Sequence, residues 1–259
     1  MPFILTKREN SIGTIVLNRP EKRNSFSTAM LRELIAALNG FRNDGTRVLV
    51  IRAEAGAPVW SAGLDIAELP TPGQDPLSYA HPIEVVLRSI QHLSAPVIAM
   101  VEGGVWGAAC DLCLTCDIVL GAPSATFAIT PAKIGVPYNS SGILHFLNVA
   151  GVRIAKEMFF TAAPIGAERA LEVGILNRLV PSADLERATY EMAARIAENS
   201  PLAISVIKEQ LRLLAGSFPL SPETFEKIQS LREKAYDSAD YREGTASFFE
   251  RRKPVFTGK

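Results

Sequence analysis

Short apolar runs alternate with helical patterns over the first half of this 259-residue chain, and this alternation constrains the fold most. The runs at 47–52, 96–101 and 117–120 are apolar apart from charged residues at their ends, as is typical of strands buried on both faces. Ile83–Leu93 has helical spacing between two of them, and another apolar helix is expected around Asp111. Such an order indicates a sheet covered by helices, so we predict an α/β fold.

Local signals mark the ends of the first elements. Phe3–Lys7 and Ile12–Leu17 flank a short polar segment, which predicts a hairpin. Ser27 precedes a helical pattern and is a good N-cap, and Gly45 is expected to end that helix. The segment 54–76 is rich in Gly, Ala and Pro, so we expect a loop there.

The C-terminal part is expected to be helical. Amphipathic patterns occur in three places after the strand signals fade near residue 139: 185–196, 202–214 and 225–235. A chain of this length favours one main unit with a smaller appendage. We therefore predict an α/β core over 1–190 and a helical region over 191–259. The tail is apolar on one face with little chain left to cover it, which favours self-association.

The charge balance excludes whole classes of partner. Lys and Arg together number 27, as do Asp and Glu, so the formal net charge is zero. A neutral chain has no general attraction for nucleic acid or for an anionic membrane surface, and we expect neither as a partner. The N-terminus lacks a signal-peptide pattern, and no stretch is apolar for the length of a membrane span. We expect a cytoplasmic protein.

The sequence favours no metal site. Three cysteines have a C-x2-C-x2-C spacing: Cys110, Cys113 and Cys116. An iron–sulfur cluster needs a fourth ligand, and these cysteines lie in an apolar segment, so we interpret them as buried core residues. The histidines show no ligand spacing either and are interpreted as ordinary residues: His81, His92 and His145.

Two loops of small residues are candidates for a binding site. Trp60–Ile66 and Gly103–Ala109 each follow an expected strand and precede a helix. Ligands of open α/β sheets bind at the carboxyl ends of the strands, where helix N-termini present free N–H groups. Two such loops side by side could supply two donors to an oxyanion. Gly and Ala in loops also serve tight turns, so both interpretations stay open here.

Longer blocks of sequence resemble a known family. The blocks are LNRPEKRNSFS (17–27), VWSAGLDIAEL (59–69), VEGGVWGAACDLCLTCDIVL (101–120), ATFAITPAKIGVP (125–137) and FFERRKPVF (248–256). Together they are similar to the crotonase (enoyl-CoA hydratase/isomerase) superfamily over almost the whole chain. The resemblance implies a ββα spiral core with a helical C-terminal trimerisation region, and a homotrimer or a hexamer built as a dimer of trimers. It also implies an acyl-CoA substrate and no metal or organic cofactor.

The same resemblance implies roles for individual residues. The backbone N–H groups of Leu64 and Ala108 would form the oxyanion hole. The family usually has Gly at the second position, and Ala keeps the N–H while slightly narrowing the site. Ala62 would bind the adenine through its backbone. Residues expected at the substrate or at CoA are Ala62, Gly63, Asp65, Ile66, Thr130, Lys22, Arg23, Arg251 and Lys253. For the four basic residues, ordinary surface charge is the alternative.

The acid–base groups must decide the reaction. Hydratases of the superfamily use two glutamates. The first matches Asp111, and the second falls near Pro131, which cannot transfer protons, so hydration and carboxylate-dependent isomerisation are disfavoured. Other segments resemble the superfamily members that decarboxylate malonyl-type thioesters: TP (130–131), VPYN (136–139), DPLSY (75–79), PLAISVIKEQLR (201–212) and YDSADYREG (236–244). In those members the tyrosine matching Tyr138 lies by the substrate carboxylate, and a histidine replaces Leu64.

We therefore expect decarboxylation of a malonyl-type CoA thioester, methylmalonyl-CoA to propionyl-CoA, through an enolate held by two backbone N–H groups. Tyr138 would orient the carboxylate or supply a proton, and Asp111 is either catalytic or a structural acid. The alternatives are an enoyl-CoA hydratase, an isomerase or a thioester hydrolase on the same scaffold. A catalytically inactive homologue that binds acyl-CoA is another.

Overall fold

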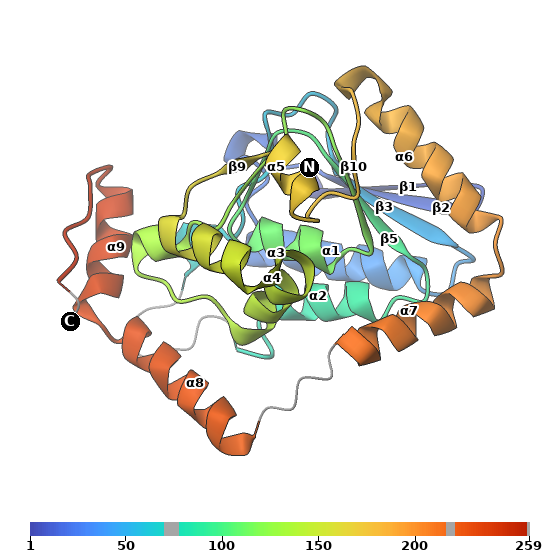
Figure 1. Ribbon diagram of the computed structural model, residues 1–259. Coiled ribbons are helices and arrows are strands. Elements are labelled where there is room, and N and C mark those ends of the chain that lie inside the picture. The colour runs from blue at the N-terminus through green and yellow to red at the C-terminus, as the bar shows by residue number, and fades with distance from the viewer. Residues whose placement is uncertain (70–77, 216–220, 258–259) are drawn as a thin grey trace.

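The computed structural model describes residues 1–69, 78–215 and 221–257 (Figure 1). Its main sheet has six strands in the order β1-β2-β3-β5-β7-β10. They are β1 (Ile4–Glu9), β2 (Ile12–Leu17), β3 (Val48–Ala53), β5 (Val97–Val101), β7 (Ile118–Gly121) and β10 (Arg178–Leu179). The first two form the expected antiparallel hairpin, and every other pairing in this sheet is parallel.

The central strands are buried on both faces, as their continuous apolar sequences predict. On β3, Leu49 and Ile51 pack toward the large core, whereas Val48 and Val50 face the opposite side. The large core is covered by α1 (Thr28–Phe41), α2 (Pro82–Gln91) and α3 (Ala108–Thr115), and the opposite face by α6 (Ser182–Ala197) (Figure 1). The main sheet is therefore a layer between helices.

A second sheet lies beside the first and was not predicted from the sequence. Its strands pair in the order β4-β6-β8-β9: β4 (Val59–Ser61), β6 (Gly104–Trp106), β8 (Thr126–Ala128) and β9 (Ile165–Gly166). They are two or three residues long, too short for periodicity to reveal. Along the chain, β3, β5 and β7 of the main sheet are each followed by a strand of the second sheet, β4, β6 and β8, and the two sets are neighbours in the same order. This repeat confirms the expected ββα spiral.

Helix starts follow local chemistry. The Ser27 hydroxyl accepts a hydrogen bond from the Met30 N–H at 3.2 Å and caps α1, as predicted. That helix ends at Phe41, before the Gly45 expected to stop it. The helical segment α4 (Ser140–Thr161) was not predicted; it consists of two helical stretches joined by a kink at Gly151, whose φ is 74°. The remaining short helices are α5 (Ala167–Glu172), η1 (Pro20–Lys22), η2 (Ile66–Glu68) and η3 (Pro131–Ile134).

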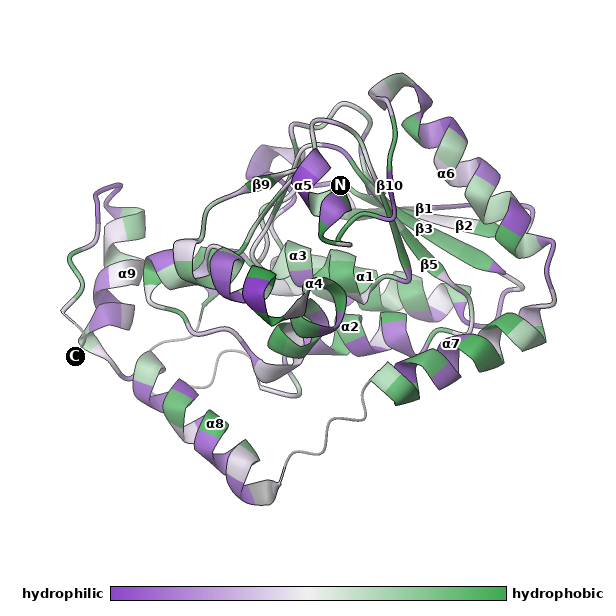
Figure 2. Cartoon of the chain, in the orientation of Figure 1, coloured by the Kyte–Doolittle hydropathy of each residue, from purple (hydrophilic) through white to green (hydrophobic). Residues whose placement is uncertain are grey.

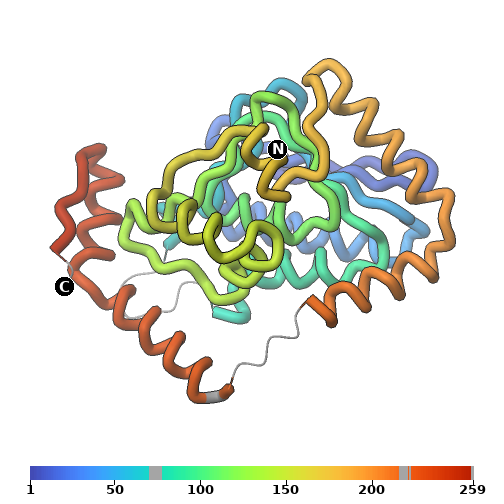
Figure 3. Tube along the Cα trace, viewed as in Figure 1, coloured from blue at the N-terminus to red at the C-terminus, as the bar shows by residue number. Residues whose placement is uncertain are grey.

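The C-terminal helices run around the edge of the spiral (Figure 3). They are α7 (Pro201–Ala215), α8 (Pro222–Tyr236) and α9 (Ala239–Phe249). The expected division at residue 190 falls inside α6, which packs on the main sheet, and the two-part organisation stays a prediction. Apolar residues remain exposed on these helices among their polar ones (Figure 2): Leu202, Val206, Ile207, Leu211, Leu213, Leu214, Phe225, Leu231, Phe248 and Phe249.

Candidate active site

Two backbone loops touch at the centre of the site. Gly63 follows β4 with φ 81°, and a Cβ built on it would lie 2.5 Å from the Trp106 carbonyl oxygen and 2.9 Å from the Ala108 nitrogen. Any side chain there would push the loops apart, so this glycine is needed for the close approach. The two loops of small residues predicted from the sequence therefore do lie side by side.

Each loop presents one free backbone N–H group. Leu64 lies opposite Phe26, whose own N–H and C=O bond to Gly63 and Asp65, so the Leu64 N–H points away from that neighbour. Ala108 is the first residue of α3, where the helix supplies no acceptor. Across the described part of the chain, neither N–H has a hydrogen-bond acceptor. Both residues line the same cavity, so two donors can converge on one oxygen atom.

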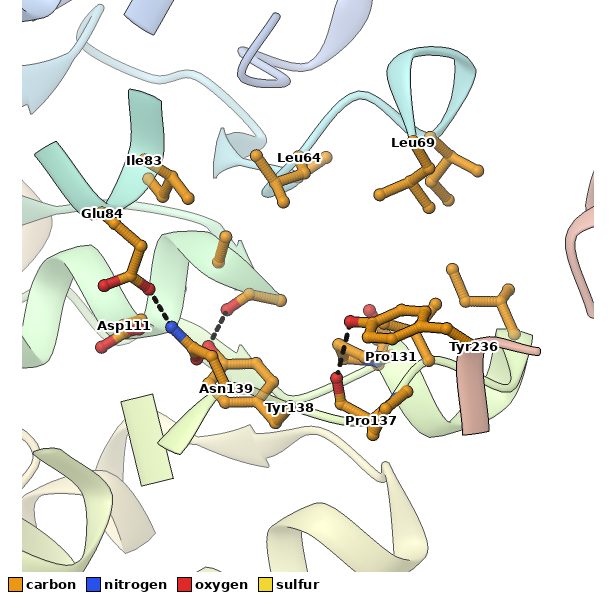
Figure 4. A pocket seen from close by; sticks show the side chains of 17 residues that line it. Leu64, Leu69, Ile83, Glu84, Asp111, Pro131, Pro137, Tyr138, Asn139 and Tyr236 are labelled. Carbon is orange, nitrogen blue, oxygen red and sulfur yellow. Dashed lines mark hydrogen bonds between the residues drawn. The ribbon is translucent and has the colours of Figure 1, made fainter. Parts of the chain in front are cut away.

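The cavity has an apolar end and a polar end (Figure 4). The apolar end is formed by Leu69, Ile134, Val136, Pro137 and Tyr236. Tyr236 is the last residue of α8, and its hydroxyl donates to the Pro137 carbonyl at 3.1 Å. The C-terminal helices therefore supply part of the wall.

The polar end holds two carboxyl groups with different partners. Asp111 on α3 accepts from His145 Nδ1 of α4 at 2.5 Å, and both side chains are largely buried. Glu84 on α2 accepts from the Asn139 amide and from the Ser141 hydroxyl. Burial and the nearby charge of Asp111 raise the pKa of Glu84. Burial alone would lower the pKa of His145, but the hydrogen bond to Asp111 and the charges of Asp111 and Glu84 outweigh it and raise that pKa.

Tyr138 lies between the polar end and the backbone donors. Its hydroxyl donates to the Gly107 carbonyl at 3.2 Å, one residue before Ala108. Its ring packs edge-on against Phe146 and Phe159 of α4, at centroid separations of 6.2 and 5.0 Å. Burial, reinforced by the charge of Asp111, raises the pKa of the hydroxyl well above its usual range. Tyr138 therefore stays neutral and available as a hydrogen-bond donor.

Comparison with known proteins identifies the family of this chain. The model of the enoyl-CoA hydratase/isomerase family matches residues 7–259. The chain belongs to this family. It is 45% identical over 249 residues to methylmalonyl-CoA decarboxylase from Escherichia coli strain K12, covering 96% of this chain and 95% of the relative. It is 34% identical over 261 residues to carnitinyl-CoA dehydratase from the same strain, covering 97% of each.

Solved structures give the same result. A methylmalonyl-CoA decarboxylase in complex with 2-nitronate-propionyl-CoA superposes with a TM-score of 0.97, at 44% identity, covering 99% of each chain. A methylmalonyl-CoA decarboxylase complexed with 2S-carboxypropyl-CoA has the same TM-score and identity, covering 99% of this chain and 98% of that one. The family assignment therefore rests on both sequence and fold.

Most residues predicted from the family resemblance line the cavity: Ala62, Leu64, Ile66, Ala108, Asp111, Thr130 and Tyr138. Gly63 acts through the loop contact described above. The Ala62 N–H donates to the Arg23 carbonyl at 2.9 Å, and the expected role of Ala62 at the adenine stays a prediction. Asp65 does not line the cavity; it caps η2 and forms an ion pair with Arg19 at 3.0 Å.

The basic residues expected at CoA lie outside the cavity. Lys22 and Arg23 are exposed on the segment that touches Ala62, and Arg251 and Lys253 are exposed after α9. Their role at CoA phosphates stays a prediction. Of the DPLSY block, residues 75–77 lie outside the described residues, as do 70–76 of the expected loop; the described part of that loop contains β4 and η2.

Several site residues were missed by sequence reasoning. Glu84 carried a usable signal, because a carboxylate on the apolar face of the expected 83–93 helix needs a polar partner. His145 carried none. It is 34 positions from Asp111 and on another helix, and only the packing of α3 against α4 brings the two together. The interpretation of His145 as an ordinary residue was therefore incomplete.

The other sequence expectations concern metals and membranes. All three cysteines are buried as free thiols, as interpreted. Within residues 1–69, 78–215 and 221–257, no group of three or more His, Cys, Asp or Glu side chains is placed to hold a metal ion. No helix in these ranges is long and apolar enough to cross a membrane.

Proposed function

We propose that this enzyme decarboxylates a malonyl-type CoA thioester, with methylmalonyl-CoA the first candidate and propionyl-CoA the product. The observation that carries the proposal is the pair of free N–H groups, Leu64 and Ala108, at one apolar cavity that also contains the Tyr138 hydroxyl. Loss of CO2 leaves an enolate whose charge lies on the thioester oxygen. Two donors aimed at that oxygen stabilise it, each by about 3 kcal/mol in other oxyanion holes.

The charges around the cavity are compatible with an anionic substrate. Asp111 is paired with His145, so the pair has little net charge when the imidazole is protonated. Glu84 is engaged by Asn139 and Ser141, which hold its oxygens. A substrate carboxylate is therefore not strongly repelled. The apolar surroundings disfavour its charge and so favour its loss as CO2.

Tyr138 is the group that would recognise the carboxylate. Its neutral hydroxyl makes only a long bond to Gly107, at 3.2 Å, and can turn its proton toward a stronger acceptor. Leu64 supports the proposal through its backbone N–H, and its side chain adds to the apolar wall. The relatives and structures described as methylmalonyl-CoA decarboxylase support the same reaction.

The rest of the assembly is proposed on the family's pattern. The Ala62 carbonyl would accept from the adenine, with Lys22, Arg23, Arg251 and Lys253 near CoA phosphates. The reaction needs no metal or organic cofactor, because the thioester itself accepts the electron pair. A cytoplasmic homotrimer or a dimer of trimers would cover the exposed apolar residues of α7, α8 and α9.

A panel of thioesters tests the reaction. The purified protein is incubated with malonyl-, methylmalonyl-, ethylmalonyl- and crotonyl-CoA, and the products are followed by mass. We expect a malonyl-type substrate to lose the mass of CO2 and crotonyl-CoA to stay unchanged. Rapid hydration of crotonyl-CoA with methylmalonyl-CoA left intact would show that the reaction is wrong while the family assignment stands.

Hydration is the second candidate because of one observation. The case against it rested on Pro131, which does line the cavity, but the structure supplies another carboxyl group, Glu84, from a different helix. Two carboxyl groups can share acid and base roles. Glu84 is already held by Asn139 and Ser141, which leaves it less free to activate water and so favours decarboxylation.

A further inference from the structure

Two cavities adjoin at the polar cluster of Glu84, Asn139, Asp111 and His145. Asp111 lines the cavity of the two free N–H groups, whereas His145 lines a second cavity between α2, α4, α7 and α8. Glu84 and Asn139 line both. The Asp111 side chain is only 4% exposed, and that of His145 is 15% exposed. His145 is thus the member of the pair that meets solvent.

We propose that Asp111 and His145 deliver a proton from the second cavity to the α-carbon of the enolate. The proposal rests on the proposed function, because decarboxylation leaves an enolate that must be protonated. Asp111 lies one helical turn after Ala108, on the same side of α3, and so faces the place where the thioester oxygen would be held. A proton on its carboxyl group is therefore close to the reacting carbons.

The hydrogen bonds around His145 form a continuous route. Nδ1 bonds to Asp111 Oδ1 at 2.5 Å, and Nε2 bonds to the Gln91 amide at 2.9 Å. The Gln91 side chain can donate from its amide nitrogen to an unprotonated Nε2. After a half-turn, its amide oxygen can accept from a protonated Nε2, so the ring keeps this partner in both states. The Thr115 hydroxyl lies 3.3 Å from Nδ1 and holds the ring in place.

The charged groups facing His145 favour its protonated form. Asp111 comes from α3 and Glu84 from α2, and together they raise the pKa of the imidazole against the effect of burial. Three arginines also line the second cavity: Arg88, Arg212 and Arg232. Arg212 is paired with Glu209, and Arg88 lies 3.9 Å from a carboxylate oxygen of Glu84, so a carboxylate opposes each of these two charges.

The proton balance of the route is simple. When CO2 leaves, its C–C bond breaks and the electron pair passes into the enolate. The imidazolium gives its Nδ1 proton to Asp111, and Asp111 gives a proton to the α-carbon, forming the new C–H bond. A carboxylate and a neutral imidazole that keeps its Nε2 proton remain. Nδ1 then regains one proton from water that enters through the second cavity, which restores the imidazolium.

Hydrogen exchange of the product tests this route separately from decarboxylation. Propionyl-CoA is incubated with the protein in D2O, and deuterium uptake at the α-carbon is followed by mass. The exchange runs the route in reverse and needs no carboxylate on the substrate. We expect the wild type to exchange and His145→Gln, which keeps a hydrogen bond but carries no proton, to exchange about a hundredfold more slowly.

Two further measurements separate proton delivery from a structural role. CO2 release in the first turnover of methylmalonyl-CoA should stay near the wild-type rate in His145→Gln, since breaking the C–C bond needs no added proton. A merely structural role would slow both reactions together. The matched control is His92→Gln, an exposed histidine at the end of α2, which should change neither.

The pH dependence of hydrogen exchange in the wild type gives an independent test of the proton route. Removing the α-proton requires a neutral His145 to accept it, so exchange should rise with pH and level off above the raised pKa of that group. A flat profile, an absence of exchange in the wild type, or normal exchange in His145→Gln would each overturn the proposal. Exchange without CO2 release from methylmalonyl-CoA would support the proton route and contradict only the proposed reaction.

Discussion

Tyr138 and Asp111 are the residues whose side chains separate decarboxylation from hydration. Tyr138→Phe should slow methylmalonyl-CoA decarboxylation about ten- to a hundredfold, because a hydrogen bond to a charged group contributes about 1.5–3 kcal/mol. Affinity for propionyl-CoA, which lacks the carboxylate, should hardly change.

Asp111→Asn should reduce CO2 release less than Tyr138→Phe does, since no base is needed to start the reaction. The measurement is CO2 release in the first turnover of methylmalonyl-CoA and the rate of hydration of crotonyl-CoA for both variants, and a hydratase would show the opposite ranking.

Two substitutions of Ala108 test whether its backbone N–H stabilises the enolate. Ala108→Pro removes the N–H, and the first position of a helix accepts proline without breaking the helix, so the variant should fold. Its decarboxylation rate should fall by about a hundredfold or more, while CoA still binds. Ala108→Gly keeps the N–H and should retain activity. Equal large losses in both variants, measured as kcat, would mean that the methyl group matters rather than the donor.

At the scale of elements, the start of α4 decides how the polar end is assembled. Gly142 on this helix has no room for a side chain, since a Cβ there would lie 2.6 Å from Asp111 Oδ2 and 2.6 Å from Asn139 Oδ1. Gly142→Ala should therefore displace the cluster, with a loss of stability of about 1–3 kcal/mol from overpacking and a lower decarboxylation rate. Thermal unfolding and activity measure both effects.

Gly40→Ala is the matched control for that change. Gly40 also lies in a helix, α1, and a Cβ there would meet nothing within 4 Å. Alanine has the better helix propensity, so this variant should be as stable as the wild type or more stable by about 0.5–1 kcal/mol, with unchanged activity. If Gly142→Ala and Gly40→Ala had the same thermal stability and the same activity, the tight packing around Gly142 would not be needed for either.

The elements themselves differ in how far sequence could predict them. The central strands of the main sheet were predictable because a strand buried on both faces must be almost continuously apolar, as β3 and β5 are. The edge strand β10, two residues long, was not predicted. The second sheet was not, because β4, β6 and β8 are three residues long and their register is set by their neighbours in space. The site loops attached to them were nevertheless recognisable from their small residues.

At the scale of the whole molecule, the outer helices predict association. Lys208 of α7 bonds to the Ile90 and Ala95 carbonyls and to Asp117, which fixes the helix on the core with several apolar residues exposed. Large exposed apolar surfaces on a folded chain mark interfaces. We expect a trimer or a dimer of trimers, measured by sedimentation or light scattering at micromolar concentration. A monodisperse monomer would contradict this expectation.

The sequence by itself determined the α/β class, the backbone loops of the site and four lining residues near the reaction: Leu64, Ala108, Asp111 and Tyr138. These features depend on local rules, namely apolar periodicity, glycine at tight approaches and family motifs that lie within short segments. Tertiary structure alone decided which polar groups meet Asp111. Glu84 comes from α2, His145 from α4 and Asn139 from the N-cap of α4, and side chains so far apart along the chain are brought together only when helices pack and bury them.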